Sequence, residues 1–407
     1  MSAKQPPPNF FHCPPLGRSE RELFKELAIA SAHELAEKSQ LIGGPIQWEL
    51  DSNERNVRVY AGKVAESKHD AFVATPFLST IEVMGTMTEV FDLFRSQTTE
   101  EAKEYRRRFE KVTDDTINLY SIVPATSQTP QEMVGISWQG YKHSMDSFLL
   151  RRDACLLVVH HAFEFNGKPV WVRCIRSVEL PSCPVMSGFV RMAVNCSGYV
   201  FTELDKPGCI GVTYIAHTAA GGSIGDYAQW LTDMTSRKRC RNLTDIDRFL
   251  RENRLSKTPF MRLDEAKPVA LASSCFLCTR RFGPFSKKAN CLKCGEVCCR
   301  RCIRVWHVKN RGFDAQAHVC TKCALGKQHD GEDRQAWWRS SRSTTTEGSR
   351  CGSEGYPTPL SRSAPTVYPT SLSRSASTTS PRLDNFELIV DSKVWSSKKR
   401  QQITSPA

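Results

Sequence analysis

Four Cys-x-x-Cys pairs between Cys275 and Cys323 constrain the fold of this chain more than any other sequence feature. Each pair places two thiolates on one side of a tight turn. Two pairs complete a tetrahedral Zn²⁺ site with Zn–S distances of about 2.3 Å. The pairs therefore predict two closed structural zinc sites that leave no open position for a catalytic water. The eight ligands are Cys275, Cys278, Cys291, Cys294, Cys299, Cys302, Cys320 and Cys323.

The spacing leaves two arrangements of these ligands open. In one, sequence neighbours share an ion. In the other, the pairs interleave, and we expect this arrangement because it would lock a segment too small to build its own hydrophobic core. Cys298 lies outside the pattern, and we expect it to be a buried side chain that binds no metal. Interleaving assigns Cys275, Cys278, Cys299 and Cys302 to the first zinc, and Cys291, Cys294, Cys320 and Cys323 to the second.

Positive charge is concentrated in the same segment. Cys275–Cys323 carries 11 Lys and Arg against 2 acidic residues, and residues 331–407 carry 11 against 7. These segments account for the whole formal net charge of +13, so residues 1–274 are neutral. A basic zinc module on a neutral body suggests an anionic partner: a phosphorylated lipid headgroup, an acidic membrane or nucleic acid. Nucleic acid ranks third because the segment lacks interleaved stacking aromatics.

Composition at the two ends of the chain indicates disorder. Residues 1–17 are rich in proline, and residues 327–407 are rich in serine and threonine. The second segment contains a near-repeat, Tyr356–Thr366 and Tyr368–Thr378, and could carry docking sites for protein partners. The chain has no run of 18 apolar residues and no secretory signal at its start. We therefore expect a cytoplasmic protein, whose reduced thiols favour zinc over disulfides.

Between these ends, the pattern predicts an α+β fold. A capping-box pattern at Ser19 and Glu22 opens an N-terminal helix within residues 18–44 that runs to Lys38, with Leu23 and Leu35 on its apolar side. A second capping box, Thr86 to Glu89, opens a helix after two short strand segments at Trp48–Leu50 and Val57–Tyr60.

The clearest sheet signal lies farther along the chain. β-rich runs over Asp153–Phe165 and Pro169–Leu180 flank Asn166-Gly167, which predicts a hairpin because both turn residues need positive φ. An apolar helical repeat then extends from about Ile224 to Glu252. An antiparallel sheet wrapped on one long helix can either fill its interior or keep a ligand cavity.

Residues 45–255 resemble a START domain, the helix-grip fold of lipid-transfer and lipid-sensing proteins. The resemblance implies one lipid or sterol in a cavity that the last helix gates. Arg191 aligns with a family position whose side chain can face that cavity in a salt bridge. Alternatively, Arg191 forms a purely structural ion pair, and we favour this alternative. The resemblance rests on Arg152-Asp153, Trp171-Val172, Ser177, Pro184, Gly188-Phe-Val-Arg191, Thr213 and Gly221-Gly222. The Asp and Pro that usually flank the turn before the last helix are missing.

After a linker over residues 256–270, residues 271–326 resemble a FYVE zinc finger in ligand number, order and spacing. FYVE fingers are interleaved two-zinc domains that bind phosphatidylinositol 3-phosphate on endosomal membranes. The framework here is kept, but the recognition code is degenerate. Lys287-Lys288-Ala289-Asn290-Cys291 stands in place of the Arg-Arg-His-His-Cys strand, and His318-Val319-Cys320 in place of Arg-Val-Cys. The Trp-x-x-Asp before the first pair is absent.

The FYVE resemblance nevertheless implies a membrane-binding surface. Because lysine cannot supply the bidentate geometry of arginine, loose attraction to acidic lipid is expected, at about 1 kcal/mol per basic residue. Phe282 either inserts into the membrane or belongs to the small core of the finger. The candidate contacts are Arg280, Arg281, Lys287, Lys288, Lys293 and His318, together with the inserting tip Pro284-Phe285.

The sequence thus predicts a non-enzymatic, zinc-binding adaptor on endosomal membranes, with a START-like domain for a lipid or sterol and a finger for phosphoinositide or acidic membrane. The main alternative is a zinc-stabilised protein-interaction scaffold with a packed START fold. A RING-like ubiquitin ligase is less favoured, because RING fingers usually include a histidine ligand. A catalytic role for Cys155 with His160 or His161 is also disfavoured, because these residues lie in an apolar strand run.

Overall fold

The computed structural model describes residues 6–326, apart from 8, 55, 65–73, 110–112, 142–150 and 222–224. The Ser/Thr-rich tail and its near-repeat therefore lie outside the described residues, as do residues 1–5 of the predicted disordered start. Within the described ranges, no helix is both long enough and apolar enough to span a bilayer.

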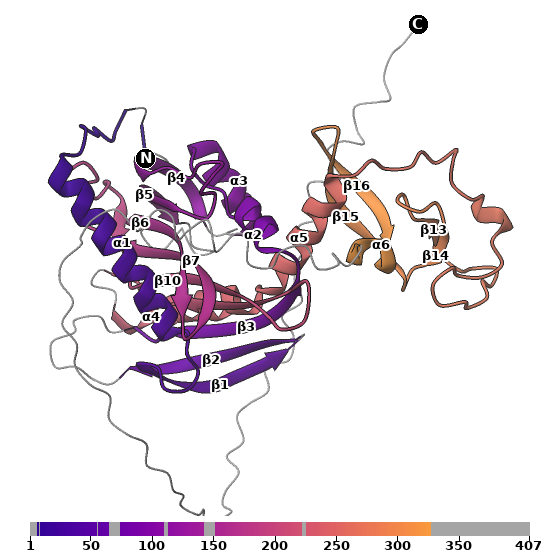
Figure 1. Cartoon of the computed structure of the whole chain (residues 1–407), viewed down its shortest axis with the longest axis horizontal. Coiled ribbons are helices and arrows are strands. Elements are labelled where there is room, and N and C mark those ends of the chain that lie inside the picture. The colour runs from indigo at the N-terminus through magenta and orange to yellow at the C-terminus, as the bar shows by residue number, and fades with distance from the viewer. Residues whose placement is uncertain are drawn as a thin grey trace, which may run out of the picture. The chain divides into compact units, whose positions relative to one another are not determined.

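A ten-stranded sheet forms the body of the molecule (Figure 1). Its path runs β1-β2-β3-β11-β10-β7-β6-β5-β4 with antiparallel neighbours throughout, and β8 joins β6 in parallel. Asn166 and Gly167 adopt φ of 52° and 75° between β6 and β7, which confirms the predicted hairpin. The strands are β1 (Ile46–Glu54), β2 (Val57–Val64), β3 (Phe77–Met84), β4 (Thr113–Val123), β5 (Met133–Tyr141), β6 (Arg151–Phe165), β7 (Lys168–Ser177), β8 (Phe189–Arg191), β10 (Ser197–Glu203) and β11 (Cys209–Ala216), with β9 (Ala193–Val194) and β12 (Thr218–Ala219) paired separately.

Helix α1 (Arg18–Lys38) packs on one face of the sheet, across β6, β7 and β10. It ends at the predicted residue, but its N-cap is Gly17, two residues before the predicted Ser19. The Glu20 carboxylate accepts a hydrogen bond from the backbone N–H of Gly17, at 2.7 Å. Leu35 is fully buried as expected, whereas Leu23 is 62% exposed, because the buried stripe runs through Ala28, Ala32 and Ala36 instead.

Part of the segment for which we predicted disorder packs on the same face. Phe10, Phe11 and Leu16 contact the cluster around α1, and the Phe11 and Trp138 ring centroids lie 5.5 Å apart. Aromatic burial of this kind stabilises a segment that has no helix or strand of its own. The proline-rich composition did not reveal it.

The other face of the sheet is covered by α2 (Met87–Leu93), α3 (Thr99–Phe109), α4 (Gly225–Arg241) and α5 (Thr244–Ser256). The single long C-terminal helix that we predicted is therefore wrong: it is two helices. Hydrogen bonds of the 3₁₀ type tighten the backbone between them, from Leu243 N to Cys240 O (3.3 Å) and from Ile246 N to Leu243 O (3.1 Å). The break lets Cys240, Leu243 and Ile246 all reach the core.

The cysteine-rich segment forms two small hairpins and a short helix. Its elements are η1 (Val269–Leu271), β13 (Lys288–Asn290) paired with β14 (Val297–Cys299), β15 (Ile303–Asn310) paired with β16 (Phe313–Cys320), and α6 (Thr321–Leu325). The end of α5 belongs to this unit as well as to the body, because Leu255 lies in the finger's buried cluster. The segment 256–270, predicted as a linker, is docked: Met261 N donates to Leu292 O at 2.8 Å.

Candidate functional site

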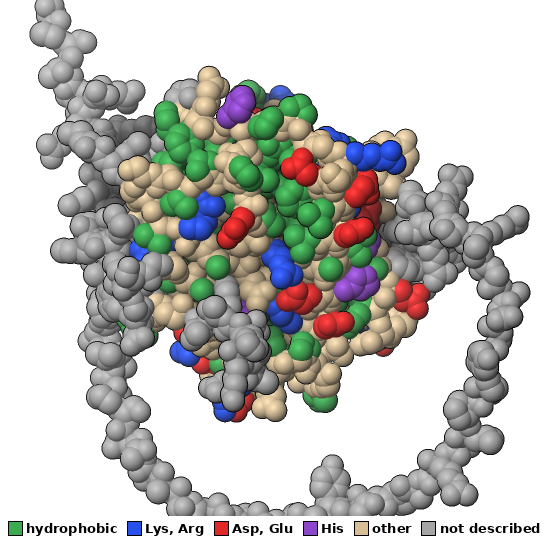
Figure 2. Space-filling model, turned by 90° about the vertical axis from the view of Figure 1, so that its left-hand side faces the viewer, with side chains coloured by type: hydrophobic (Ala, Val, Ile, Leu, Met, Phe, Trp, Pro, Cys, Tyr) green, Lys and Arg blue, Asp and Glu red, His purple; other side chains and the backbone are tan. Residues whose placement is uncertain are grey.

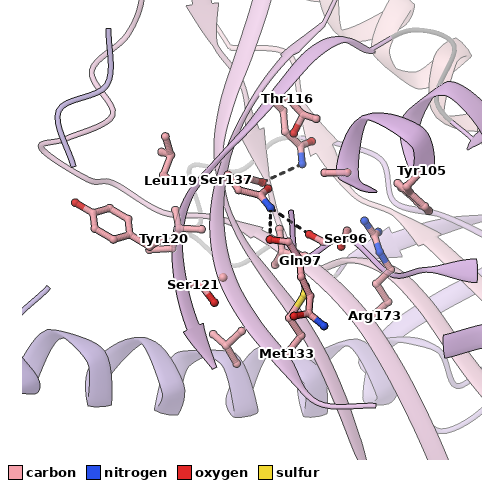
Figure 3. Close-up of a pocket in the computed structure, with 17 residues that line it drawn as sticks. Ser96, Gln97, Tyr105, Thr116, Leu119, Tyr120, Ser121, Met133, Ser137 and Arg173 are labelled. Carbon is pink, nitrogen blue, oxygen red and sulfur yellow. Dashed lines mark hydrogen bonds between the residues drawn. The ribbon is translucent and has the colours of Figure 1, made fainter. Parts of the chain in front are cut away.

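A pocket of about 200 Å³ lies in the body, between the β4–β7 end of the sheet and α3 (Figure 3). Strand alternation places its Arg173 on the same sheet face as Trp171, the face that α5 covers. The remainder of that face is filled by aromatic side chains, among them Phe91, Phe94 and Phe201, whose rings meet that of Trp171 in edge-on or tilted contacts. The interior is thus packed at one end and hollow at the other.

The lining of this pocket is more polar than the apolar cavity expected for a whole lipid. Apolar contributions come from Met133, Ile136 and Val158. Polar ones come from Ser96, Thr116, Asn118, Ser121, Ser137, Gln139 and Arg173. Ligand pockets of 300–1,000 Å³ are typical for drug-sized molecules, so this one suits the polar end of an amphiphile better than an entire two-chain lipid.

Arg191, the predicted cavity residue, does not line this pocket. Its guanidinium forms a bidentate ion pair with Asp153, with both N···O distances at 2.9 Å. Asp153 is fully buried and also accepts a hydrogen bond from the Trp138 indole at 3.0 Å. Burial opposes the charged form of Arg191, but the hydrogen bond and charge of Asp153 outweigh it and raise the pKa of the guanidinium. The structural ion pair, our favoured alternative, is the arrangement observed.

No nucleophile–base pair forms around Cys155 in the described part of the chain. Cys155 and His160 are five residues apart on β6, so their side chains point to opposite faces of the sheet. His161 lies on the same face as Cys155 but six residues away, about 20 Å along the strand. Its Nδ1 lies 2.8 Å from a Glu132 carboxylate oxygen instead. Cys155 and His160 are therefore buried packing residues of the sheet, and His161 pairs with Glu132.

The eight predicted metal ligands come together in two sets. One holds Cys275, Cys278, Cys299 and Cys302, the other Cys291, Cys294, Cys320 and Cys323, and within each set all Sγ atoms lie within 4.8 Å of one another. The first Cys-x-x-Cys pair thus meets the third, and the second meets the fourth. This is the interleaved arrangement, and each set could hold a metal ion.

Several details fit a tetrahedral thiolate site. The Sγ atoms of Cys278 and Cys299 lie 3.7 Å apart. An S···S edge of about 3.8 Å follows from a tetrahedron with metal–sulfur distances of about 2.3 Å, whereas a disulfide would need about 2.05 Å. Cys298 is fully buried and belongs to neither set, as expected for a packing residue.

Backbone amides further prepare the sulfurs for a cation. Cys299 N lies 3.3 Å from Cys275 Sγ, and Cys320 N lies 3.3 Å from Cys291 Sγ. Burial opposes the Cys275 thiolate, but the amides that donate to it prevail and lower its pKa to about 6. N–H···S hydrogen bonds of this kind orient thiolate ligands and tune a metal site.

The two sets share one turn geometry. The residue after the second cysteine is in the left-handed region in both knuckles, with φ of 54° at Thr279 and 73° at Gly295. The backbone N–H of this residue donates a hydrogen bond to the carbonyl of the first cysteine: Thr279 N to Cys275 O at 2.9 Å, and Gly295 N to Cys291 O at 2.7 Å. A Cβ at Gly295 would lie 2.8 Å from the sulfur of Met261, so that side chain would have to shift if another residue stood there.

The predicted membrane contacts divide into two groups. The side chains of Arg280, Arg281, Lys287 and His318, with the tip Pro284-Phe285, are exposed. Phe285 is 98% exposed. Phe282 is instead half-buried and packs against the finger's cluster, which decides between its two predicted roles.

Lys288 and Lys293 have structural partners. Lys288 Nζ donates to Ala272 O at 2.9 Å and lies 5.0 Å from the ring centroid of Phe282. Lys293 Nζ caps the C-terminal end of α5, donating to Leu255 O (2.8 Å), Thr258 O (2.6 Å) and Pro259 O (3.1 Å). A cation at this position complements the unsatisfied carbonyls and the negative end of the helix dipole.

Other contacts join α5 to the finger. His307 N donates to the Glu252 carboxylate at 3.2 Å, and Lys309 N donates to Ser256 Oγ at 2.9 Å. Arg254 donates to Leu325 O at 3.0 Å and to both carboxylate oxygens of Glu89 at 2.9 Å. Helix α5 therefore links the sheet-covering helix α2 to strand β15 and the end of α6.

Sequence reasoning allowed for a cavity in the body, but it predicted neither its position beside α3 nor its single cation, Arg173. The residue lies in the run Val170-Trp171-Val172-Arg173-Cys174, whose neighbours on both sides are fully or almost fully buried. A charged side chain in a strand that is buried on both faces is unusual, and that was the available signal.

The comparisons with known proteins found similarity for the body and none for the cysteine-rich segment. Residues 156–253 match the family model of the START domain. Similar solved structures include human StAR-related lipid transfer protein 5 (16% identity, TM-score 0.40, 55% of this chain and 99% of that one). They also include a STAR-related lipid transfer protein from Xanthomonas axonopodis (17%, 0.36, 50% and 98%) and the lipid transfer and protein localization domain of human StarD13 (15%, 0.36, 57% and 97%).

No curated protein matches the chain, and no FYVE family model matches its cysteine-rich segment. The START match begins within β6 and ends within α5, so it includes Arg173 of the pocket and both C-terminal helices. Residues 156–253 are therefore the part of this chain that is similar to a START domain.

Proposed function

We propose that this protein is a non-enzymatic, cytoplasmic lipid-binding adaptor. Its START-like body holds the polar end of one lipid, and its two-zinc finger attaches the chain to acidic, phosphoinositide-bearing endosomal membranes. The START match supports the first role, because the matched strands β6 and β7 contribute to a pocket on the helix-covered face of the sheet.

Zinc is the metal that the donor set favours. Four thiolates in a closed tetrahedral arrangement suit Zn²⁺, and each set leaves no position for a reacting water. The ions would be structural, joining hairpins that bury few apolar side chains of their own. The sulfurs of both sets would hold them without any part in a reaction.

The membrane role rests on one observation: an almost fully exposed aromatic side chain at a basic tip. Phe285 is 98% exposed, and Arg280, Arg281 and Lys287 nearby in sequence are exposed as well. No salt bridge to these three cations is present within the described ranges. Cations beside an apolar tip attract anionic headgroups while the ring enters the interface.

Residues 1–274 are neutral overall, although α4 ends in a basic run that includes Lys238, Arg239 and Arg241. The face in Figure 2 mixes basic, acidic and hydrophobic side chains, in line with the neutral charge balance of residues 1–274. The electrostatic attraction to a membrane is therefore expected to come from the finger.

Liposome co-sedimentation of the full zinc-loaded chain tests this function. The vesicles would be neutral, or contain phosphatidylserine, or contain each monophosphorylated phosphoinositide at matched charge. Phe285→Ser should lose most of the pelleting on acidic vesicles. Phe313→Ser is the matched control, since Phe313 is 79% exposed on the other hairpin of the finger.

The outcomes separate the possibilities. Selective pelleting with phosphatidylinositol 3-phosphate, reduced in Lys287→Ala, would mean that the finger still reads that headgroup. Equal pelleting on all acidic vesicles that fades with salt would mean an electrostatic anchor. An absence of pelleting on every vesicle would overturn the membrane role and leave a zinc-stabilised interaction scaffold.

A further inference from the structure

Arg173 is a buried cation without a counter-ion. The residue is 4% exposed. Among the residues that the structure describes, no oxygen accepts a hydrogen bond from its side chain, and its Nε atom is buried without a partner. Guanidinium stays protonated in proteins, so this charge cannot be relieved by losing a proton. Burying an unpaired charge is costly, which makes its presence here informative.

Two other cations of the body, the buried Lys38 and the half-buried Arg191, show how such a charge is usually paired. Lys38 lies 2.6 Å from the Glu34 carboxylate, and Arg191 forms its bidentate pair with Asp153. The same chain therefore supplies carboxylates to cations elsewhere in the body. No carboxylate of the described residues pairs with Arg173.

Among the residues that the structure describes, aromatic rings contact the Arg173 guanidinium. Its guanidinium carbon lies 4.3 Å from the ring centroid of Tyr105 and 5.8 Å from that of Phe94. His160 is its cross-strand neighbour on β6. Burial, and secondarily the charge of Arg173, lower the pKa of His160 well below its ordinary value, so the imidazole is neutral. Ring faces attract the guanidinium without neutralising it.

Hydroxyl groups lie at the same pocket. Ser96 lines it beside Arg173 (Figure 3), and its Oγ is buried without a hydrogen-bond partner. Ser137 Oγ accepts from the Gln139 amide at 3.3 Å and can itself donate. The pocket thus joins one fixed positive charge to hydroxyl donors and to the apolar side chains of Met133 and Val158.

We propose that this pocket binds a single-chain amphiphile through its acid group, a carboxylate or a phosphate, which pairs with Arg173. The inference rests on the proposed lipid-binding function and names the headgroup class. An anion would satisfy the guanidinium bidentately and accept from Ser96. A cavity of about 150 Å³ holds benzene, so about 200 Å³ holds an acid group with the first part of a short chain.

The test measures ligand binding to the full zinc-loaded chain, by native mass spectrometry and by the shift in melting temperature. The probes are decanoate, decyl phosphate and 1-decanol, which share one chain and differ in the headgroup. Wild type should bind at least one of the two acids at least tenfold more tightly than the alcohol. The Arg173→Met variant should bind that acid at least tenfold more weakly than wild type.

Arg176→Met is the matched control. Arg176 is on the same strand but three residues farther, so its side chain lies on the opposite face, where it pairs with Glu34 at 2.8 Å. This variant should keep the acid preference. Without ligand, Arg173→Met should melt at the same temperature as wild type or higher, because it removes an unpaired buried charge and keeps the packing on Tyr105. Arg173→Lys should keep a weakened preference for the acid.

Three results would overturn the inference. Equal binding of acids and alcohol would refute the headgroup assignment while leaving lipid binding intact. An acid preference that persists in Arg173→Met would place the anion elsewhere. If Arg173→Met fails to fold, the same conclusion follows when Arg173→Lys keeps as strong an acid preference as Arg176→Met. Binding of none of the three probes would overturn both this inference and the lipid-binding role of the body.

Discussion

The body and the finger of this protein are stabilised by different physical means. The body buries Trp138 and Trp171 completely and has extensive apolar clusters on both faces of its sheet. The buried cluster of the finger is small: it has four cysteines and seven other residues, with Trp306 as its one buried aromatic residue among those described. Apolar burial contributes about 25 cal/mol per Å², which suffices for a large sheet but not for two short hairpins. The finger is therefore expected to depend on metal ions held by its two thiolate sets.

This difference has a consequence for substitutions. A buried residue of the body contributes through packing or pairing and can be lost singly at a moderate cost. A ligand cysteine of the finger contributes through a site that four residues complete together. The following predictions test that contrast, beginning with the largest expected effect.

Removal of metal should unfold the finger and leave the body folded. Structural zinc sites in finger peptides bind with about 10–16 kcal/mol at neutral pH, and this free energy is also their folding free energy. Elemental analysis should find two ions per chain, and a strong chelator should abolish the protease resistance of residues 271–326 while residues 45–241 stay protected. Cys299→Ser should behave like the chelated protein.

Cys298→Ala is the control for that experiment. The residue neighbours Cys299 but belongs to neither thiolate set, so the variant should retain both ions. Loss of an ion in Cys298→Ala, or melting of the whole body on chelation, would contradict the division between the two regions.

Breaking the buried ion pair should give the largest single effect in the body. Asp153→Ala leaves the Arg191 guanidinium and the Trp138 indole without their acceptor. Removing one partner of a buried pair typically costs about 3–5 kcal/mol. Urea unfolding measures it, and the metal content should not change. Glu22→Ala, which breaks an exposed pair with Lys25, should cost less than about 1 kcal/mol.

Lys293→Met should lower stability by about 1–2 kcal/mol, because charge-assisted hydrogen bonds to the end of α5 are lost. Lys287→Met is the matched control, since its exposed side chain has no such role. Thermal melts of both variants decide this point. If the two variants melt together, the lysine cap is not a joint between the regions, and the contrast between Lys287 and Lys293 is wrong.

The smallest expected effect is on the pH dependence of stability, through the Glu89 carboxylate. Burial opposes the Glu89 carboxylate, but its hydrogen bonds and ion pair with Arg254 prevail and lower its pKa below the ordinary 4.5. A lowered folded-state pKa contributes stability above the unfolded value, and that contribution is lost as pH falls through the folded one. Glu89→Gln should therefore lower the stability at pH 7, where the ion pair with Arg254 contributes, and flatten the decline below about pH 4.5, where variant and wild type should converge. An unchanged acid limb in urea titrations between pH 3 and 7 would exclude this linkage.

Local chemistry explains which expectations from the sequence were confirmed. The capping box of Thr86 and Glu89 is present with both hydrogen bonds, at 3.0 and 3.3 Å, because it needs only residues three apart. The hairpin at Asn166-Gly167 is equally local. Strand β4 was missed, because its sequence Thr113–Val123 is polar and its identity depends on pairing with β5.

The candidate site divides in the same way. Cysteine spacing alone predicted the eight ligands, since a Cys-x-x-Cys knuckle is a local structure. Which of the predicted basic residues remain accessible was not predictable. Lys288 and Lys293 differ from Lys287 only in the carbonyls that the fold brings to them.

By itself, the sequence determined that this chain has two regions, a neutral α+β body and a basic eight-cysteine finger, because composition, spacing and turn chemistry act over a few residues. Only the tertiary structure decided that the thiolate pairs interleave, that the last helix is broken at Asn242-Leu243, and that Arg191 is paired while Arg173 is not. These facts depend on contacts between residues far apart in the chain. Such contacts arise only once the sheet and its covering helices bring those residues to one place.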